Sequence, residues 1–172
     1  DLMATVACEV HHSDERFDWT GFYRVVAPGL LKIGPYQGGH GCLTIPFDKG
    51  VCGAAARTGE VQLVPDVEAF PGHIACSSST RSELVLPVRD ADGNIIAVFD
   101  IDSDLPDAFT SADAKALAAI LSEVFEDTDY FLMTTTPQMA SGATRHVLNQ
   151  SGRSFIAWSD RAINSSIFST GR

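Results

Sequence analysis

Cys76 has the surroundings best suited to nucleophilic chemistry. It lies near the end of the segment PDVEAFPGHIACS, residues 65–77, which has neither helical nor strand periodicity. A loop of this length is unusual in a compact domain and is usually functional or disordered. Phe70 and Ile74 are apolar anchors, so we expect the loop to dock. If the hydroxylic residues after Cys76 begin a helical turn, its positive N-terminus would favour the thiolate. A cysteine simply packed inward is the alternative.

Four acidic residues could form an acidic pocket. Glu83 stands at the start of one apolar segment, and Asp100, Asp102 and Asp104 alternate at the end of the next. Alternation along a strand points the three aspartates to one face. Close carboxylates repel one another, so one of them could hold a proton. Such a pocket could bind an ammonium group and protonate a leaving oxygen. The alternative is that Asp102 and Asp104 only cap the loop after the strand.

The chain has four cysteines, at positions 8, 42, 52 and 76. In the reducing cytosol, cysteines are buried hydrophobes, metal ligands or catalysts. Cys8 lies on a predicted helix face and is assigned no role. Zinc bound by Cys42, Cys52, His73 and Cys76 is one possible reading. No CxxC pair is present, however, and the spacing of His73 and Cys76 alone is weak evidence for a metal.

Composition excludes two classes of partner. The chain has 172 residues, 45% of them hydrophobic, and a formal net charge of −10. That charge argues against nucleic-acid binding, which needs clustered Lys and Arg. No apolar run approaches the ~18 residues that span a bilayer. No secretory leader is visible either. We therefore expect a soluble, cytoplasmic protein that binds neither nucleic acid nor membrane.

Local patterns predict helices at both ends of a set of strands. Residues 27–29 (APG) and 90–93 (DADG) are turn signals between apolar segments. Thr110 and Asp113 form a predicted capping box at a helix start. Gly59 is placed just past the end of a short Ala-rich helix. The predicted strands span 19–26, 30–37, 61–64, 82–88 and 94–101, with a further short one starting at Cys42, and the helices span 2–12, 51–58 and 110 onward.

This order of elements predicts an α+β fold, with an antiparallel sheet and helices packed on one face. We predict a catalytic domain over residues 1–130. Residues 131–172 differ in composition, because they are rich in Ser and Thr, carry four Arg and contain one acid, Asp160. We interpret them as a C-terminal extension of unknown role.

At these residues the sequence resembles the free methionine-(R)-sulfoxide reductases of the GAF-domain class. The resemblance covers roughly residues 19–124. FPGHIAC together with both upstream cysteines is highly specific, whereas the fold alone hosts many functions. The motifs, in chain order, are WTGFY from Trp19, GPYQG from Gly34, CLTIPF from Cys42, GVCGAA from Gly50, VPDV from Val64, FPGHIAC from Phe70, Ser82-Glu83 and DIDS from Asp100.

The resemblance implies a role for each matching residue. Cys76 is the nucleophile, and Cys42 and Cys52 supply resolving or auxiliary thiols, with Cys42 the first choice. The other implied positions line or adjoin the substrate pocket: Glu83, Asp100, Asp102, Trp19 and Tyr23.

The resemblance also implies a reaction path. Free methionine-(R)-sulfoxide would be reduced to methionine, leaving a sulfenic acid and then an intramolecular disulfide. An external dithiol such as thioredoxin would reduce that disulfide. No metal, flavin or nucleotide is needed, and a homodimer is expected. The competing hypothesis is a non-enzymatic GAF sensor for a small ligand, although an acidic pocket suits a phosphate poorly.

Overall fold

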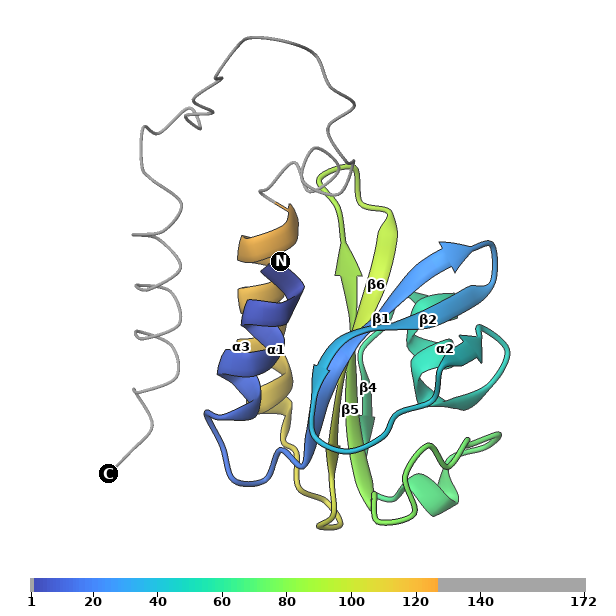
Figure 1. Ribbon diagram of the computed structural model, residues 1–172, viewed down its shortest axis with the longest axis vertical. Coiled ribbons are helices and arrows are strands. Elements are labelled where there is room, and N and C mark those ends of the chain that lie inside the picture. Colours follow the sequence, from blue (N-terminus) through green and yellow to red (C-terminus); the bar gives the residue numbers. More distant parts are fainter. Residues whose placement is uncertain (1, 127–172) are drawn as a thin grey trace, which may run out of the picture. The chain divides into compact units, whose positions relative to one another are not determined.

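The computed structural model describes residues 2–126 of the chain, as helices, strands and short turns (Figure 1). The predicted extension over 131–172 lies outside the described residues, so the boundary near residue 130 stays a prediction. In chain order the elements are α1 (Leu2–His11), β1 (Trp19–Ala27), β2 (Leu30–Gln37), β3 (Thr44–Pro46), α2 (Gly50–Thr58), β4 (Gln62–Val64), the 3₁₀ turn η1 (Val67–Ala69), β5 (Ser82–Arg89), β6 (Ile95–Ser103), α3 (Ser111–Leu121) and the π-helical turn η2 (Ser122–Glu126).

The strands of this part form one antiparallel sheet in the order β3-β2-β1-β6-β5-β4. The two predicted turns make the hairpins β1–β2 and β5–β6. Gly93 closes the second hairpin with φ +83°, which favours glycine. The α+β class and the antiparallel sheet predicted from the sequence are confirmed.

Alternation along β1 separates the two faces of the sheet. Phe22 points to one face, where its ring lies 4.6 Å from that of Phe99 and 5.7 Å from that of Phe125. Tyr23 points to the other face and packs in a core cluster with residues of α2 such as Val51. Each face therefore has its own apolar core, because side chains alternate with period two.

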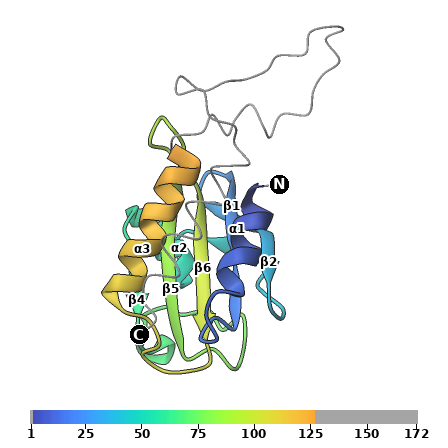
Figure 2. The ribbon, with the colours of Figure 1, turned by 90° about the vertical axis from the view of Figure 1, so that its left-hand side faces the viewer.

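The helices divide between these two faces, which corrects the one-face prediction for one helix. α1 and α3 lie together against one face, as expected, whereas α2 lies on the opposite face (Figures 1 and 2). Small residues of α2 allow this packing. α2 is buried through small residues, and a Cβ on Gly53 would lie 2.5 Å from the carbonyl oxygen of Pro46. The small face lets α2 approach the sheet closely.

The helix ends follow the predicted signals. Thr110 and Asp113 form the reciprocal capping box at the start of α3. Gly59 ends α2 in the left-handed region, with φ +70°. None of the described helices is long and apolar enough to cross a membrane.

Arg16 joins the segment after α1 to the start of α3. Its Nη2 donates to Asp14 Oδ2 at 2.6 Å and to Asp113 Oδ1 at 3.1 Å, and its Nη1 donates to the Ala108 carbonyl oxygen. Hydrogen bonds from Arg16 lower the pKa of Asp14. Burial raises the pKa of Asp113, but hydrogen bonds from Arg16 and Thr110 outweigh it and lower that pKa overall.

We predict a pH-dependent loss of stability in Arg16→Leu. At pH 7 its free energy of unfolding should fall by about 1–2 kcal/mol, since charge-assisted hydrogen bonds are lost. Both carboxyl pKa values are lowered by folding, so this contribution is complete above the unfolded value of about 3.9. It disappears as the pH falls through the folded pKa values. Urea unfolding at pH 7 and at successively lower pH values below about 3.9 follows this loss.

The exposed Arg24 makes no ion pair within residues 2–126, so Arg24→Leu is the matched control. A difference between wild type and Arg16→Leu that stays constant down to pH 3 would contradict the assignment.

Candidate active site

A disulfide joins Cys42 to Cys76, with their Cα atoms 5.0 Å apart. Cys42 precedes β3 and Cys76 ends the irregular loop after η1, so 34 residues separate them in the chain. Both side chains are half-buried against the core cluster. The structure thus brings together the first-choice pair of cysteines.

The loop that carries Cys76 is held at both ends and in the middle. Val67 N–H donates to the Arg81 carbonyl oxygen at 2.9 Å, and Gly50 N–H donates to that of Gly72 at 3.0 Å. Phe70 and Ile74 pack against the core cluster, which confirms the predicted docking. These contacts place Cys76 over the start of α2.

The helical turn expected after Cys76 does not form. Residues 76–79 are a bend, in which the Ser79 N–H donates to Ser77 Oγ and the two hydroxyl groups are 3.1 Å apart. Serine side chains compete with helical backbone hydrogen bonds in this way. Residues 76–79 therefore provide no helix N-terminus that would favour the Cys76 thiolate.

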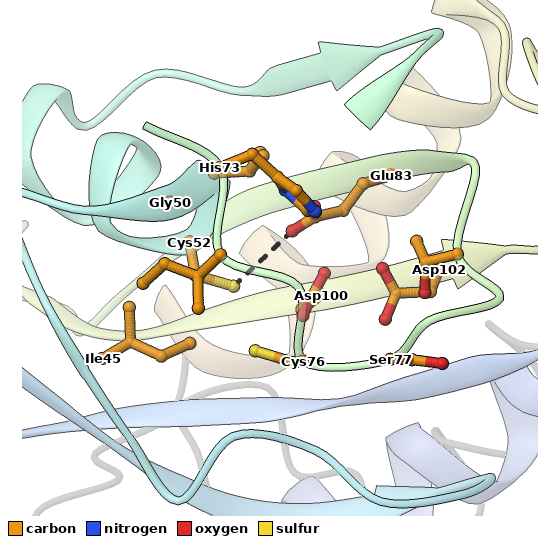
Figure 3. Close-up of a pocket in the computed structure, with 12 residues that line it drawn as sticks. Ile45, Gly50, Cys52, His73, Cys76, Ser77, Glu83, Asp100 and Asp102 are labelled. Carbon is orange, nitrogen blue, oxygen red and sulfur yellow. Dashed lines mark hydrogen bonds between the residues drawn. The ribbon is translucent and has the colours of Figure 1, made fainter. Parts of the chain in front are cut away.

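Strand register brings the predicted carboxylates together. Glu83 of β5 pairs with Asp102 of β6, and Asp100 lies two residues earlier on the same face. All three line one pocket beside Cys76 (Figure 3). Asp104, expected in the same row, lies beyond the end of β6 and is exposed, with its N–H donating to Asp18 Oδ2. The alternation rule ends with the strand, so Asp104 leaves the pocket.

Burial makes the negative charge of this pocket unfavourable. It raises the pKa of Glu83 well above its ordinary value, and the neighbouring Asp100 and Asp102 raise it further. Burial likewise raises the pKa of Asp102 well above its ordinary value, with Asp100 adding to it. The pKa of Asp100 rises to about 7, although hydrogen bonds from Cys52 and Glu83 oppose the rise. The site therefore retains protons near neutral pH.

Cys52 lies on α2 at the floor of the pocket. Its side chain is 3% exposed and its thiol donates to Glu83 Oε1 at 3.9 Å. Burial raises the pKa of this thiol well above its ordinary value, and the negative charges of Asp100 and Glu83 raise it further. Cys52 is a free thiol in the structure. Because the thiolate is the nucleophile, this environment disfavours Cys52 as the attacking group.

Trp19 and Tyr23 lie on the same face of the sheet as the carboxylates but outside the pocket lining. Their rings stack with centroids 5.7 Å apart, and Trp19 pairs with Asp102 in the β1–β6 register. Trp19 Nε1 is buried and has no hydrogen-bond partner among residues 2–126. Both aromatics therefore belong to the core, next to the predicted pocket residues.

His73 also reaches the pocket, although the sequence favoured an ordinary loop histidine. Its Nδ1 is buried without a hydrogen-bond partner in the described part of the chain, and burial lowers its pKa. Ile45, Val51 and Thr80 complete the lining and were not singled out from the sequence. Val51 reaches the site because α2 packs on this face, a contact that local patterns do not encode.

The GAF domain model matches residues 3–124 of this chain. The chain belongs to the GAF-domain family. Among its relatives, the free methionine-R-sulfoxide reductase of Escherichia coli is 42% identical over 116 residues, which are 66% of this chain and 69% of that protein. Protein YtsP of Bacillus subtilis is 45% identical over 66% of this chain and 70% of its own length.

A solved structure of similar fold and sequence is also a free methionine-R-sulfoxide reductase. The free methionine-R-sulfoxide reductase of Neisseria meningitidis in complex with its substrate superposes with a TM-score of 0.67 at 40% identity. The match covers 73% of this chain and 76% of that one. The resemblance to the free methionine-(R)-sulfoxide reductases is thereby confirmed.

We predict that Gly41 is needed to place Cys42. A Cβ here would lie 2.8 Å from the Tyr23 hydroxyl and 3.0 Å from the Trp19 ring, and both side chains are fixed by burial. Gly41→Ala should therefore strain the loop by about 1–3 kcal/mol. The disulfide should then reduce about tenfold more readily in dithiothreitol redox buffers, as measured by the fraction of free thiols.

Gly39→Ala is the matched control, because a Cβ there would meet nothing within 4 Å. Equal reduction equilibria for the two variants would argue against this role of Gly41.

Proposed function

We propose that this protein reduces free methionine-(R)-sulfoxide to methionine, with Cys76 as nucleophile. The observation that carries the proposal is the Cys42–Cys76 disulfide beside a pocket lined by three buried or half-buried carboxyl groups. A redox pair and a proton-holding pocket are the two requirements for removing an oxygen from a sulfoxide. The named relatives support the same reaction.

In the first step the Cys76 thiolate attacks the sulfoxide sulfur while a carboxylic acid of the pocket donates a proton to the oxygen. The oxygen passes to Cys76, the S–O bond of the substrate breaks and methionine leaves. The substrate sulfur gains two electrons, and Cys76 is oxidised to the sulfenic acid. The ionised carboxylates of the pocket would bind the substrate ammonium group. That contact favours the free amino acid, because a peptide-bound residue lacks the ammonium group.

In the second step the Cys42 thiol attacks the Cys76 sulfenic acid, which forms the disulfide and releases water. An external dithiol then reduces the disulfide by thiol exchange, and thioredoxin has the potential for it, about −270 mV. No bound cofactor takes part in these steps. The homodimer expected from the resemblance stays a prediction.

The decisive experiment measures turnover of the separated R and S epimers of free methionine sulfoxide with dithiothreitol. We expect wild type to reduce the R epimer alone and Cys76→Ser to lose all turnover. Cys8→Ser is the control for loss of a thiol, because Cys8 lies on α1, outside the pocket lining. Well-folded wild type that reduces neither epimer would favour a ligand sensor instead.

The resolving role of Cys42 has its own test. With thioredoxin as reductant, Cys42→Ser should release one methionine per chain and then turn over at least about tenfold more slowly, because the Cys76 sulfenic acid waits for an external thiol. Dimedone labelling followed by mass spectrometry should place the sulfenic acid on Cys76. If Cys42→Ser still forms an intramolecular disulfide to Cys76 at the wild-type rate, Cys42 is not the resolving thiol.

A further inference from the structure

Three potential metal ligands meet at the floor of the pocket. Cys52 Sγ and a carboxylate oxygen from each of Glu83 and Asp100 all lie within 4.8 Å of one another. They come from α2, β5 and β6, and their residues are only 3%, 7% and 5% exposed (Figure 3). Three rigid elements therefore hold one sulfur and two carboxylates around a common point.

The carboxylate of Asp100 has one oxygen that accepts no hydrogen bond within the described residues. Asp100 Oδ1 is buried and has no hydrogen-bond partner in the described part of the chain. An acceptor buried without a partner is unfavourable by about 1–3 kcal/mol. None of the residues lining the pocket is Lys or Arg. Asp100 Oδ1 is therefore available to a cation, and the lining has no Lys or Arg to supply one.

The donor set indicates which cation fits. Calcium and magnesium prefer oxygen ligands alone, whereas zinc accepts thiolate and carboxylate together. A metal also deprotonates the thiol that coordinates it, so the protonated state of free Cys52 is no obstacle. With zinc–sulfur and zinc–oxygen bonds of about 2.3 and 2.1 Å, metal binding would draw the three ligand atoms about 1 Å closer together.

We propose that Cys52, Glu83 and Asp100 form a zinc-binding site, separate from the Cys42–Cys76 redox pair, with its fourth position open to the pocket. Zinc bound here would occupy the place of the substrate ammonium group and inhibit turnover. That inhibitory consequence rests on the proposed reductase function, whereas metal binding itself does not.

The site can be tested in the oxidised protein, where the disulfide removes Cys42 and Cys76 as ligands. Titration with Co²⁺ should give one saturable sulfur-to-cobalt charge-transfer band per chain, and one equivalent of Zn²⁺ should abolish it. Cys52→Ser should remove the band, and Asp100→Asn should weaken Zn²⁺ binding at least about tenfold. Cys8→Ser, which removes the other free thiol, should leave the band unchanged. Circular dichroism verifies the fold of each variant.

A band that persists in Cys52→Ser, a band that disappears in Cys8→Ser, or no saturable band in the oxidised wild type would overturn the site. A second arm measures the reduced enzyme with free methionine-(R)-sulfoxide, where Zn²⁺ should inhibit competitively and EDTA should restore the rate. If the protein binds zinc in the first arm but never reduces the sulfoxide, the metal site stands and the proposed function fails.

Discussion

The site depends on one constraint: the register of β1, β6 and β5 puts acidic groups on a face of the sheet that is otherwise apolar core. One row across the strands holds Trp19, Asp102 and Glu83, and the next holds Gly21 and Asp100. Burial disfavours negative charge at these positions, and the lining has no Lys or Arg to offset it. The pocket must therefore keep protons or take up a cation. Retained protons would serve the proposed sulfoxide reduction, and cation binding is the basis of the proposed zinc site.

Close packing around Glu83, Asp100 and Asp102 keeps these carboxyl groups buried or half-buried. α2 covers this face with small buried residues, including Ala55 and Ala56, beside the buried Glu83 and Asp100. Gly21 has no side chain because a Cβ would lie 2.4 Å from that of Tyr36 and 2.7 Å from the Trp19 ring. The rings of Trp19 and Tyr36 can therefore pack over Gly21, next to the acidic residues. Placing charge in a core lowers stability, as functional sites commonly do, and the apolar clusters on both faces must compensate.

Local signals explain why much of the fold could be predicted from the sequence. The DADG turn and the Thr110 capping box depend only on residues close together in the chain. The length and the apolar residues of the Cys76 loop were likewise sufficient to predict that it docks. The acidic pocket was predicted by alternation, which held for Asp100 and Asp102 and failed for Asp104 where the strand ends. The position of α2 was missed because it depends on tertiary contacts. The bend after Cys76 was missed because serine hydroxyls compete with the helix.

Cys42, Cys52 and Cys76 differ in the elements that carry them and in the polarity of their surroundings, and this difference underlies the separate roles that we propose for them. Cys42 and Cys76 lie on segments outside the strands and helices, so their sulfurs can bond without moving the sheet. Cys52 is fixed within α2 among buried carboxyl groups, which keeps its thiol protonated unless a metal displaces the proton. A buried thiol that resists ionisation is poorly suited to disulfide exchange, whereas a metal that displaces its proton can still bind it. The fold thus places the Cys42–Cys76 pair, for which we propose redox chemistry, beside the acidic pocket, and the proposed cation site within that pocket.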